Sequence, residues 1–229
     1  GPGETTAETA LDVPPELRNR INRFALLGQR TAGAVTLTDD SLKRRKVAVI
    51  DSGADREGLQ LLSPTHYLRQ ALSPVAELVD GTLTDILPAK PDVIILADVA
   101  RLTQSETDGL LDWLDGGGLL LRFAGPRLAA SDIARSEEDP LLPVRLREGG
   151  RAVGGTMSWG EAKPLAAFAE DSPFHGLTIP ADVTVSDQVL AQPDPDLAKR
   201  TIAALADGTP LVTRKPVGAG QVVLVHVTA

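Results

Sequence analysis

The stretch Asp92–Pro126, which reads DVIILADVARLTQSETDGLLDWLDGGGLLLRFAGP, decides the fold class of this chain. It opens with Val93–Ala97, an uninterrupted apolar run of the kind found in strands that are buried on both faces. A helix with an apolar stripe follows, and Gly116–Gly118 ends it. A second apolar strand begins at Leu119 and ends in a sharp Gly-Pro exit. The stretch therefore predicts a strand–helix–strand unit of a parallel sheet.

The helix inside this stretch is expected to start at Ser105. Serine is a favourable N-cap residue, and Asp108 three positions later gives an approximate capping box. The stripe that should face the core consists of Leu110, Leu111, Trp113 and Leu114.

Further apolar runs before this unit extend the same pattern. Val47–Ile50 predicts a buried strand, residues 64–72 a helix, and residues 75–79 a weaker strand. Alternating strands and helices of this kind are typical of an α/β fold whose parallel sheet is covered on both faces.

The amino-terminal residues have a different texture, which is polar and interrupted by proline and glycine. We expect residues 1–43 to form a lead-in with a short hairpin, made by residues 24–27 and 34–37 and packed on the main domain. Residues 44–229 are then assigned to one α/β domain.

The sequence after Gly125 becomes acidic and irregular before shorter strand-like runs appear. The Asp207-Gly208 turn predicts a hairpin, and a Gly-Ala-Gly turn follows it, so we expect a β-meander at the end of the chain. Residues 201–205 could also be helical by composition, but the Asp-Gly turn favours a strand. The runs predicted as strands are residues 142–146, 182–190, 200–205, 211–214 and 221–227.

Composition excludes several classes of function. The chain has 229 residues and a formal net charge of −8, which disfavours nucleic acid and anionic membranes as partners. It contains no cysteine, so disulfides, thiolate catalysis and cysteine-ligated metals are excluded. Its 3 histidines lack metal-ligand spacing, and no dinucleotide fingerprint follows a strand. We therefore predict no metal site and no cofactor.

The predicted site lies at the carboxyl ends of the parallel strands, because ligands of open α/β sheets bind there. The candidate cleft residues are Asp51, Ser52, Asp98, Arg101, Arg122, Phe123, Gly125 and His226. Simpler interpretations exist for Asp51 and Ser52 and for His226. Asp-Ser-Gly after a strand is more often a turn, and a histidine in an apolar run such as residues 222–227 is more often part of the core.

The run Val93–Gly125, with the closing Gly-x-Gly hairpin and strand at residues 218–227, resembles the class I glutamine amidotransferase-like superfamily. The resemblance implies a flavodoxin-like fold in three layers, with a parallel sheet between helices. The family's Gly-x-Cys-x-Gly elbow corresponds to Arg122, Phe123 and Gly125, with Phe123 at the place of the nucleophilic cysteine.

The family's catalytic pair, His-x-Glu, would correspond to His226 and Thr228, so the glutamate is missing as well as the cysteine. A thiolate is the group that attacks the glutamine amide in that family, and phenylalanine cannot replace it. We therefore do not expect glutamine hydrolysis.

The stretches LLSPTHYLRQAL, LLLRFAGPRLA, DPLLPVRLREGGRAVGG, SWGEAKPLAAFAEDSPFHGL and VLVHVTA are among those that carry a second resemblance, which covers most of the chain. Its stretches are similar to an internal segment of alphaproteobacterial membrane proteins that have an aerotolerance-type N-terminus, a pair of transmembrane helices and a C-terminal domain of unknown function. This resemblance implies a soluble module of an inner-membrane-anchored protein, with the membrane reached only through segments outside this chain.

Two hypotheses on function follow from these observations. The first is a non-catalytic, amidotransferase-like module that binds a neighbouring domain, a protein partner or a small ligand in the cleft. The alternative is a hydrolase whose nucleophile is not a cysteine. In that case the reacting groups would come from Asp51, Ser52, Asp98 and His226, and a nucleophile and a base would have to lie within hydrogen-bond reach.

Overall fold

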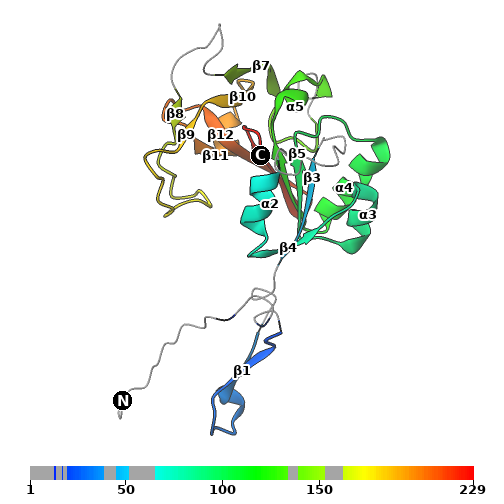
Figure 1. Ribbon diagram of the computed structural model, residues 1–229, viewed down its shortest axis with the longest axis vertical. Helices are drawn as coiled ribbons and strands as arrows, with labels where there is room; N and C mark the ends of the chain where they lie inside the picture. The colour runs from blue at the N-terminus through cyan, green and yellow to red at the C-terminus, as the bar shows by residue number, and fades with distance from the viewer. Residues whose placement is uncertain are drawn as a thin grey trace.

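The computed structural model describes residues 13, 17, 20–38, 45–51, 65–133, 139–152 and 162–229 (Figure 1). Within these residues, seven strands form one central sheet in the order β11-β12-β13-β6-β5-β3-β4. Strands β4, β3, β5, β6 and β13 run parallel, whereas β12 is antiparallel to β13 and β11 is antiparallel to β12. The strands of this sheet are β3 (Arg45–Asp51), β4 (Ala76–Val79), β5 (Val93–Ala97), β6 (Leu119–Phe123), β11 (Thr201–Ala204), β12 (Pro210–Val217) and β13 (Gly220–Val225).

The mixed α/β fold and the strands before residue 125 agree with the sequence prediction. The apolar run at residues 93–97 is β5, and the predicted meander is present as β11, β12 and β13. The sequence pattern did not predict that β13 pairs in parallel with β6. This pairing joins the meander to the parallel strands in one sheet.

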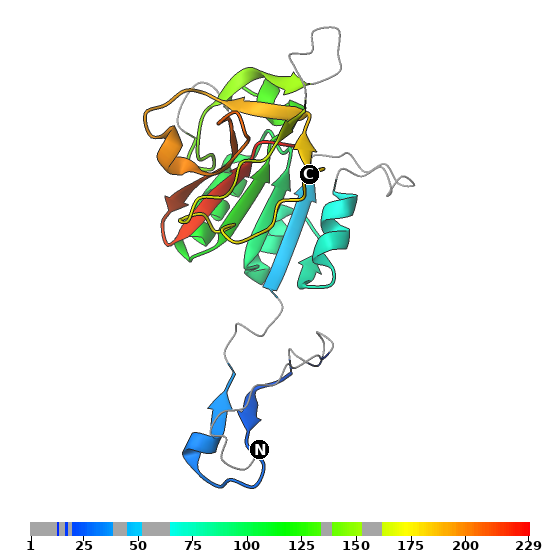
Figure 2. The ribbon, with the colours of Figure 1, turned by 90° about the vertical axis from the view of Figure 1, so that its left-hand side faces the viewer.

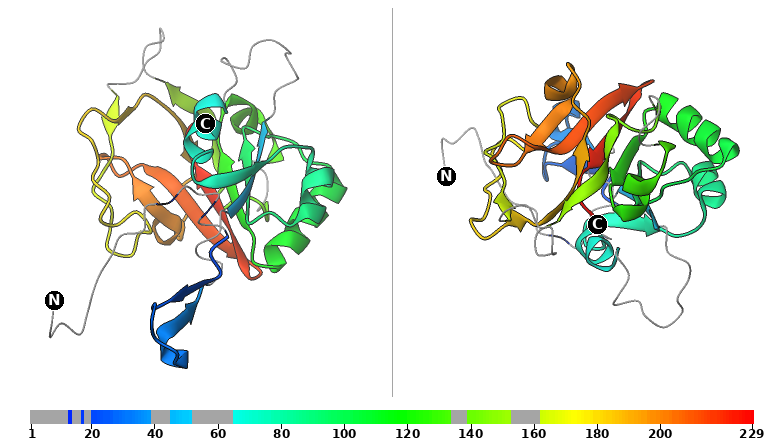
Figure 3. Two further views of the ribbon diagram at one scale, coloured as in Figure 1. Left: turned by 60° about the horizontal axis from the view of Figure 1, so that its bottom comes forward. Right: turned by 90° about the horizontal axis from the view of Figure 1, so that it is seen from above.

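Helices cover the two faces of the sheet unequally, as Figures 1 and 3 show. On one face lie α3 (Leu83–Ile86), the 3₁₀ turn η4 (Leu87–Ala89) and α4 (Gln104–Asp115), whose Leu110 and Leu114 pack against the fully buried Ile94, Leu96 and Leu120. On the other face lies α2 (His66–Leu72), which packs beside β3 and β5. Parallel strands read as continuous apolar runs because side chains on both faces are buried.

The start of α4 lies earlier than the sequence prediction. Thr103 is the N-cap, not Ser105: its hydroxyl accepts from the Glu106 N–H at 3.2 Å, and the Glu106 carboxylate accepts from the Thr103 N–H at 2.8 Å. A glutamate is long enough to reach back to the N-cap backbone, which makes Thr-x-x-Glu the better capping box of the two candidates.

Between α5 (Pro126–Ala130) and β11, the chain builds a smaller layer that packs on β11, β12 and β13 (Figure 3). Residues 142–146 were predicted as a strand, but β7 begins only at Leu146. Leu142 and Val144 are instead buried loop residues that pack on Leu128 of α5, so their apolar character serves a core contact. The other elements are β7 (Leu146–Ala152), β8 (Lys163–Pro164), β9 (Thr184–Val185), β10 (Asp187–Ala191) and α7 (Leu197–Arg200).

The amino-terminal hairpin pairs β1 (Arg23–Ala25) with β2 (Val35–Leu37) through the 3₁₀ turn η1 (Ala32–Ala34). The hairpin itself was predicted, but its packing on the main domain is not found. Every residue of both strands is exposed, and Figures 1 and 2 show the hairpin apart from the sheet domain.

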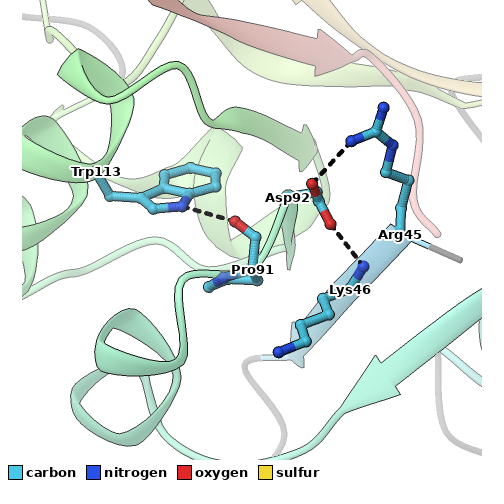
Figure 4. Close-up of polar contacts among 5 residues, drawn as sticks. All are labelled: Arg45, Lys46, Pro91, Asp92 and Trp113. Atoms are coloured by element: carbon cyan, nitrogen blue, oxygen red, sulfur yellow. Dashed lines mark hydrogen bonds and ion pairs between the residues drawn. The ribbon is translucent and has the colours of Figure 1, made fainter. Parts of the chain in front are cut away.

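Polar contacts around Asp92 connect the amino ends of the parallel strands β3 and β5 (Figure 4). The Asp92 carboxylate accepts from Arg45 Nη1 at 3.1 Å and from the Lys46 N–H at 2.8 Å, which ties the start of β3 to the start of β5. Trp113 donates its indole N–H to the Pro91 carbonyl at 2.9 Å and so joins α4 to the same corner.

Candidate functional site

Six of the eight predicted residues, all except Ser52 and Arg101, lie at one edge of the sheet. The strand register aligns Asp51 with Ala97, Ala97 with Phe123, and Phe123 with Val225, so the carboxyl ends of four strands form one row. Asp98 and His226 directly follow this row. Ser52 lies outside the described residues.

Asp98 is a helix cap. Its Oδ1 accepts from the N–H groups of Gly125 at 3.1 Å and Leu128 at 2.9 Å, and its Oδ2 accepts from the Arg127 N–H at 3.2 Å. These are donors at the start of α5, which would otherwise lack partners within the helix. The carboxylate is therefore used to join the end of β5 to α5.

Gly125 is required by this cap. A Cβ atom built at this position would lie 2.5 Å from Asp98 Cγ, which is closer than carbon atoms can approach. The glycine that resembled the end of a nucleophile elbow is thus explained by the carboxylate beside it.

Arg122 is buried inside the sheet domain. Its Nη1 donates to the Leu141 carbonyl at 3.2 Å and its Nη2 to the Val99 carbonyl at 2.6 Å, so it connects two loops that approach the end of β6. Burial lowers the pKa of the Arg122 guanidinium to about 10, and the charge of Asp139 opposes that shift. The group remains charged at neutral pH, with its Nε–H lacking an acceptor among the described residues.

His226 is fully enclosed, and both ring nitrogens have partners. Nδ1 lies 2.8 Å from the Val189 carbonyl, and Nε2 lies 3.1 Å from the Thr213 hydroxyl. A carbonyl can only accept, so Nδ1 carries the proton and Nε2 accepts from the hydroxyl. Burial lowers the pKa of His226 to about 4, although the bond to the Val189 carbonyl opposes the shift. His226 is a neutral core histidine at neutral pH.

The remaining candidates do not add a reactive pair. The Asp51 carboxylate accepts from the Thr65 hydroxyl at 3.3 Å. Phe123 is half-buried and packs in the apolar cluster under α2, and Arg101 is exposed. In the part of the chain that the structure describes, neither Asp98 nor His226 forms a hydrogen bond or ion pair with the other or with Asp51.

A feature that sequence reasoning missed lies beside the amino ends of β6 and β13. A hollow of about 800 Å³ is lined there by Lys199 and Arg200 of α7 and by Arg214 and Lys215 of β12, with Asp196 as its acidic member. Two dibasic pairs, Lys-Arg and Arg-Lys, are visible in the sequence. Only the packing of α7 beside β12 shows that they belong to one site.

No protein-family model matches this chain, and no curated protein matches it. Solved structures do resemble its fold. A cytoplasmic protein from Salmonella typhimurium LT2 is 13% identical, with a TM-score of 0.52 over 80% of this chain and 88% of that chain. The N-terminal domain of mmIFT52 is 10% identical, with a TM-score of 0.52 over 79% of this chain and 85% of that chain.

A β-galactosidase from Bacillus circulans sp. alkalophilus is also similar, at 14% identity and a TM-score of 0.51 over 81% of this chain. The match covers only 28% of the length of that enzyme. At these identities the likeness concerns the fold alone.

These findings correct the family assignment. The resemblance to class I glutamine amidotransferases is wrong, because the structures that match the fold include glycosidases and the Salmonella protein, and no family model supports an amidotransferase. The assignment to a segment of alphaproteobacterial membrane proteins is corrected on the same grounds. The structure explains Gly125 by the Asp98 carboxylate beside it, so this glycine is no evidence for a nucleophile elbow.

None of the helices in the described part of the chain combines the length and the apolar character needed to cross a membrane.

Proposed function

We propose that this chain is a non-catalytic binding module, and that its amino-terminal hairpin docks on an apolar surface of another protein domain. The observation that carries the proposal is the exposure of large apolar side chains on β1, β2 and their connection. Leu27 is 98% exposed, Leu37 76% and Leu26 67%, and Phe24 and Val35 are also exposed.

A hairpin with two strands is marginally stable on its own in water, and it normally needs packing against other elements. Burying a leucine side chain contributes about 1.5–3 kcal/mol, so a surface that covered Leu26, Leu27 and Leu37 would stabilise both the hairpin and the complex. Apolar groups gathered on one exposed element are typical of an interaction site rather than of ordinary surface.

The polar groups at the carboxyl edge support the non-catalytic part of the proposal. Asp98 holds α5, Arg122 holds two loops, and His226 is a neutral core residue. A hydrolase needs a nucleophile and a base in contact, and these groups are instead engaged in contacts that maintain the fold.

We also infer a flavodoxin-like arrangement for the main domain. The parallel strands follow one another in space as β4-β3-β5-β6-β13, which in chain order is second, first, third, fourth, fifth. This order is that of flavodoxin-like doubly wound sheets. The antiparallel strands β12 and β11 extend it on one side.

The test of the docking hypothesis starts from a photo-crosslinking amino acid at Leu27, introduced in the cells that produce this protein. The partner captured by the crosslink is then identified and purified without the crosslink. Its affinity for the wild-type chain is compared with its affinity for a Leu26→Ser/Leu27→Ser variant. We expect binding to weaken about tenfold or more, because two apolar side chains lose their cover. Arg30→Ser, in the same connection, is the matched control and should bind as wild type does.

Unchanged affinity in the double leucine variant would contradict the docking hypothesis. So would crosslinking to a second copy of this chain alone, together with a dimer in light scattering that the variant abolishes, since the partner would then be the chain itself.

A further inference from the structure

We propose that the hollow beside α7 and β12 binds the phosphate group of a small ligand. This inference is independent of the hairpin and goes beyond the docking function. The first observation is the charge of the lining: four cationic side chains, Lys199, Arg200, Arg214 and Lys215, share the hollow with one carboxylate, that of Asp196. The chain as a whole has a net charge of −8, so this local excess of positive charge runs against the overall composition.

The second observation is how the four cations are engaged. Lys199 Nζ pairs with Asp196 Oδ1 at 2.9 Å, Arg200 Nη1 donates to the Pro143 carbonyl at 2.9 Å, and Lys215 Nζ donates to the Asp139 carbonyl at 2.8 Å. Arg214 differs from these three. It is half-buried, and its guanidinium forms no hydrogen bond or ion pair with any residue in the described ranges.

A half-buried guanidinium without acceptors favours an anionic ligand. Its donors form a planar fork that fits carboxylate or phosphate oxygens, and charge-assisted hydrogen bonds of this kind are among the strongest in proteins. A carboxylate offers only two oxygens, whereas a terminal phosphate offers three and carries up to two charges. Several cations around one hollow therefore match phosphate better.

The neighbouring hollow, of about 610 Å³, indicates where the rest of the ligand would lie. It shares Lys199 and Arg214 with the first hollow and is otherwise lined largely by apolar groups, including Phe168, Leu197 and Ile202. Its lining also contains the carboxylates of Asp171 and Asp194, which would repel an anion. The phosphate therefore belongs in the first hollow, and an apolar part of the ligand in the second.

Asp196 provides an internal test of this assignment. Its pKa is lowered, first by the hydrogen bond from Lys199, so it is a carboxylate at neutral pH and competes with any bound anion. Removing its charge should strengthen binding, whereas removing the charge of Arg214 should weaken it.

The experiment is a calorimetric titration of the full chain with pyrophosphate. It is carried out at low ionic strength and repeated at higher salt. We expect saturable binding that weakens with salt, a loss of about tenfold or more in Arg214→Gln, and a gain of several-fold in Asp196→Asn. Arg147→Ala, which removes an exposed cation outside the hollow, should bind within about twofold of wild type.

Citrate distinguishes phosphate from carboxylate chemistry, because it carries comparable charge on carboxylates alone. Weaker binding of citrate supports the phosphate assignment. The proposal is overturned if pyrophosphate does not bind, if Arg214→Gln binds it as wild type does, or if citrate binds as tightly. These outcomes leave the hairpin hypothesis untouched, since the hairpin variants are tested against a different ligand.

Discussion

Two arginines, on neighbouring parts of one sheet, have opposite surroundings. Arg122, at the carboxyl end of β6, is 2% exposed and donates to two loop carbonyls. Arg214, on β12, is half-buried and has no acceptor within the described part of the chain. Position at the carboxyl edge therefore does not by itself make a polar group functional. In this chain the groups at that edge hold the fold together, and the group with unused donors lies beside the amino ends of β6 and β13.

The largest effect is expected from Arg122→Ala. The change removes two charge-assisted hydrogen bonds, leaves the carbonyls of Leu141 and Val99 without their donors, and opens a cavity. We expect the free energy of unfolding to fall by about 4 kcal/mol. Urea unfolding followed by circular dichroism measures the loss, with Arg122→Lys as the control that should lose less. A midpoint equal to that of wild type would show that Arg122 does not stabilise the fold.

The second prediction concerns the loss of stability at acidic pH that is due to His226. The pKa of His226 is about 4 in the folded chain and about 6.5 when exposed, so the unfolded state binds the proton more readily between these values. The contribution of His226 to stability is therefore fully present above pH 6.5 and falls as pH decreases toward 4, by about 3 kcal/mol in total.

This acid dependence has two measurements. Unfolding at pH 7 and pH 4.5 should show a smaller difference for His226→Gln than for wild type. If that variant does not fold, the imidazole proton resonances of wild type serve instead, and they should not titrate between pH 7 and 5. Titration near pH 6.5 would show that the ring is not enclosed as described.

Asp98→Ala should have a somewhat smaller effect, because the start of α5 is partly exposed and water can replace some of the lost contacts. Three backbone N–H groups lose the same acceptor, and we expect a loss of about 2 kcal/mol. Asp98→Asn keeps one acceptor oxygen and should lose less. If the two variants unfold at the midpoint of wild type, Asp98 is available for chemistry and the carboxyl edge must be considered again as a reactive site.

The sequence predicted what local patterns encode. Val93–Ala97 and the strand from Leu119 were placed correctly because an apolar run between turn signals has few alternatives. The N-cap was placed two residues late at Ser105, since the reach of Glu106 to Thr103 matters more than the identity of a single serine. Leu142 and Val144 are apolar because they pack on Leu128, so a tertiary contact produced the pattern that was interpreted as a strand.

The candidate site was predicted less well, because its chemistry depends on contacts between distant segments. The row of strand ends was correct, as register follows from the parallel pairing. The role of Asp98 depends on Gly125 and Leu128, which lie far along the chain. The cationic hollow depends on α7 packing beside β12, and two basic dipeptides in a sequence give no sign that they will face one ligand.

The smallest effect on stability is expected from Arg214→Gln, which tests directly whether Arg214 differs from Arg122 in its contribution to the fold. The change removes the same charged group as Arg122→Ala but breaks no hydrogen bond or ion pair with the described residues. Substitutions of this kind usually change the free energy of unfolding by no more than about 0.5 kcal/mol, and relief of repulsion from Arg200 and Lys199 acts in the stabilising direction. The same urea series measures it. A loss as large as that of Arg122→Ala would mean that Arg214 also holds the fold, and the two arginines would then no longer distinguish a structural site from a binding site.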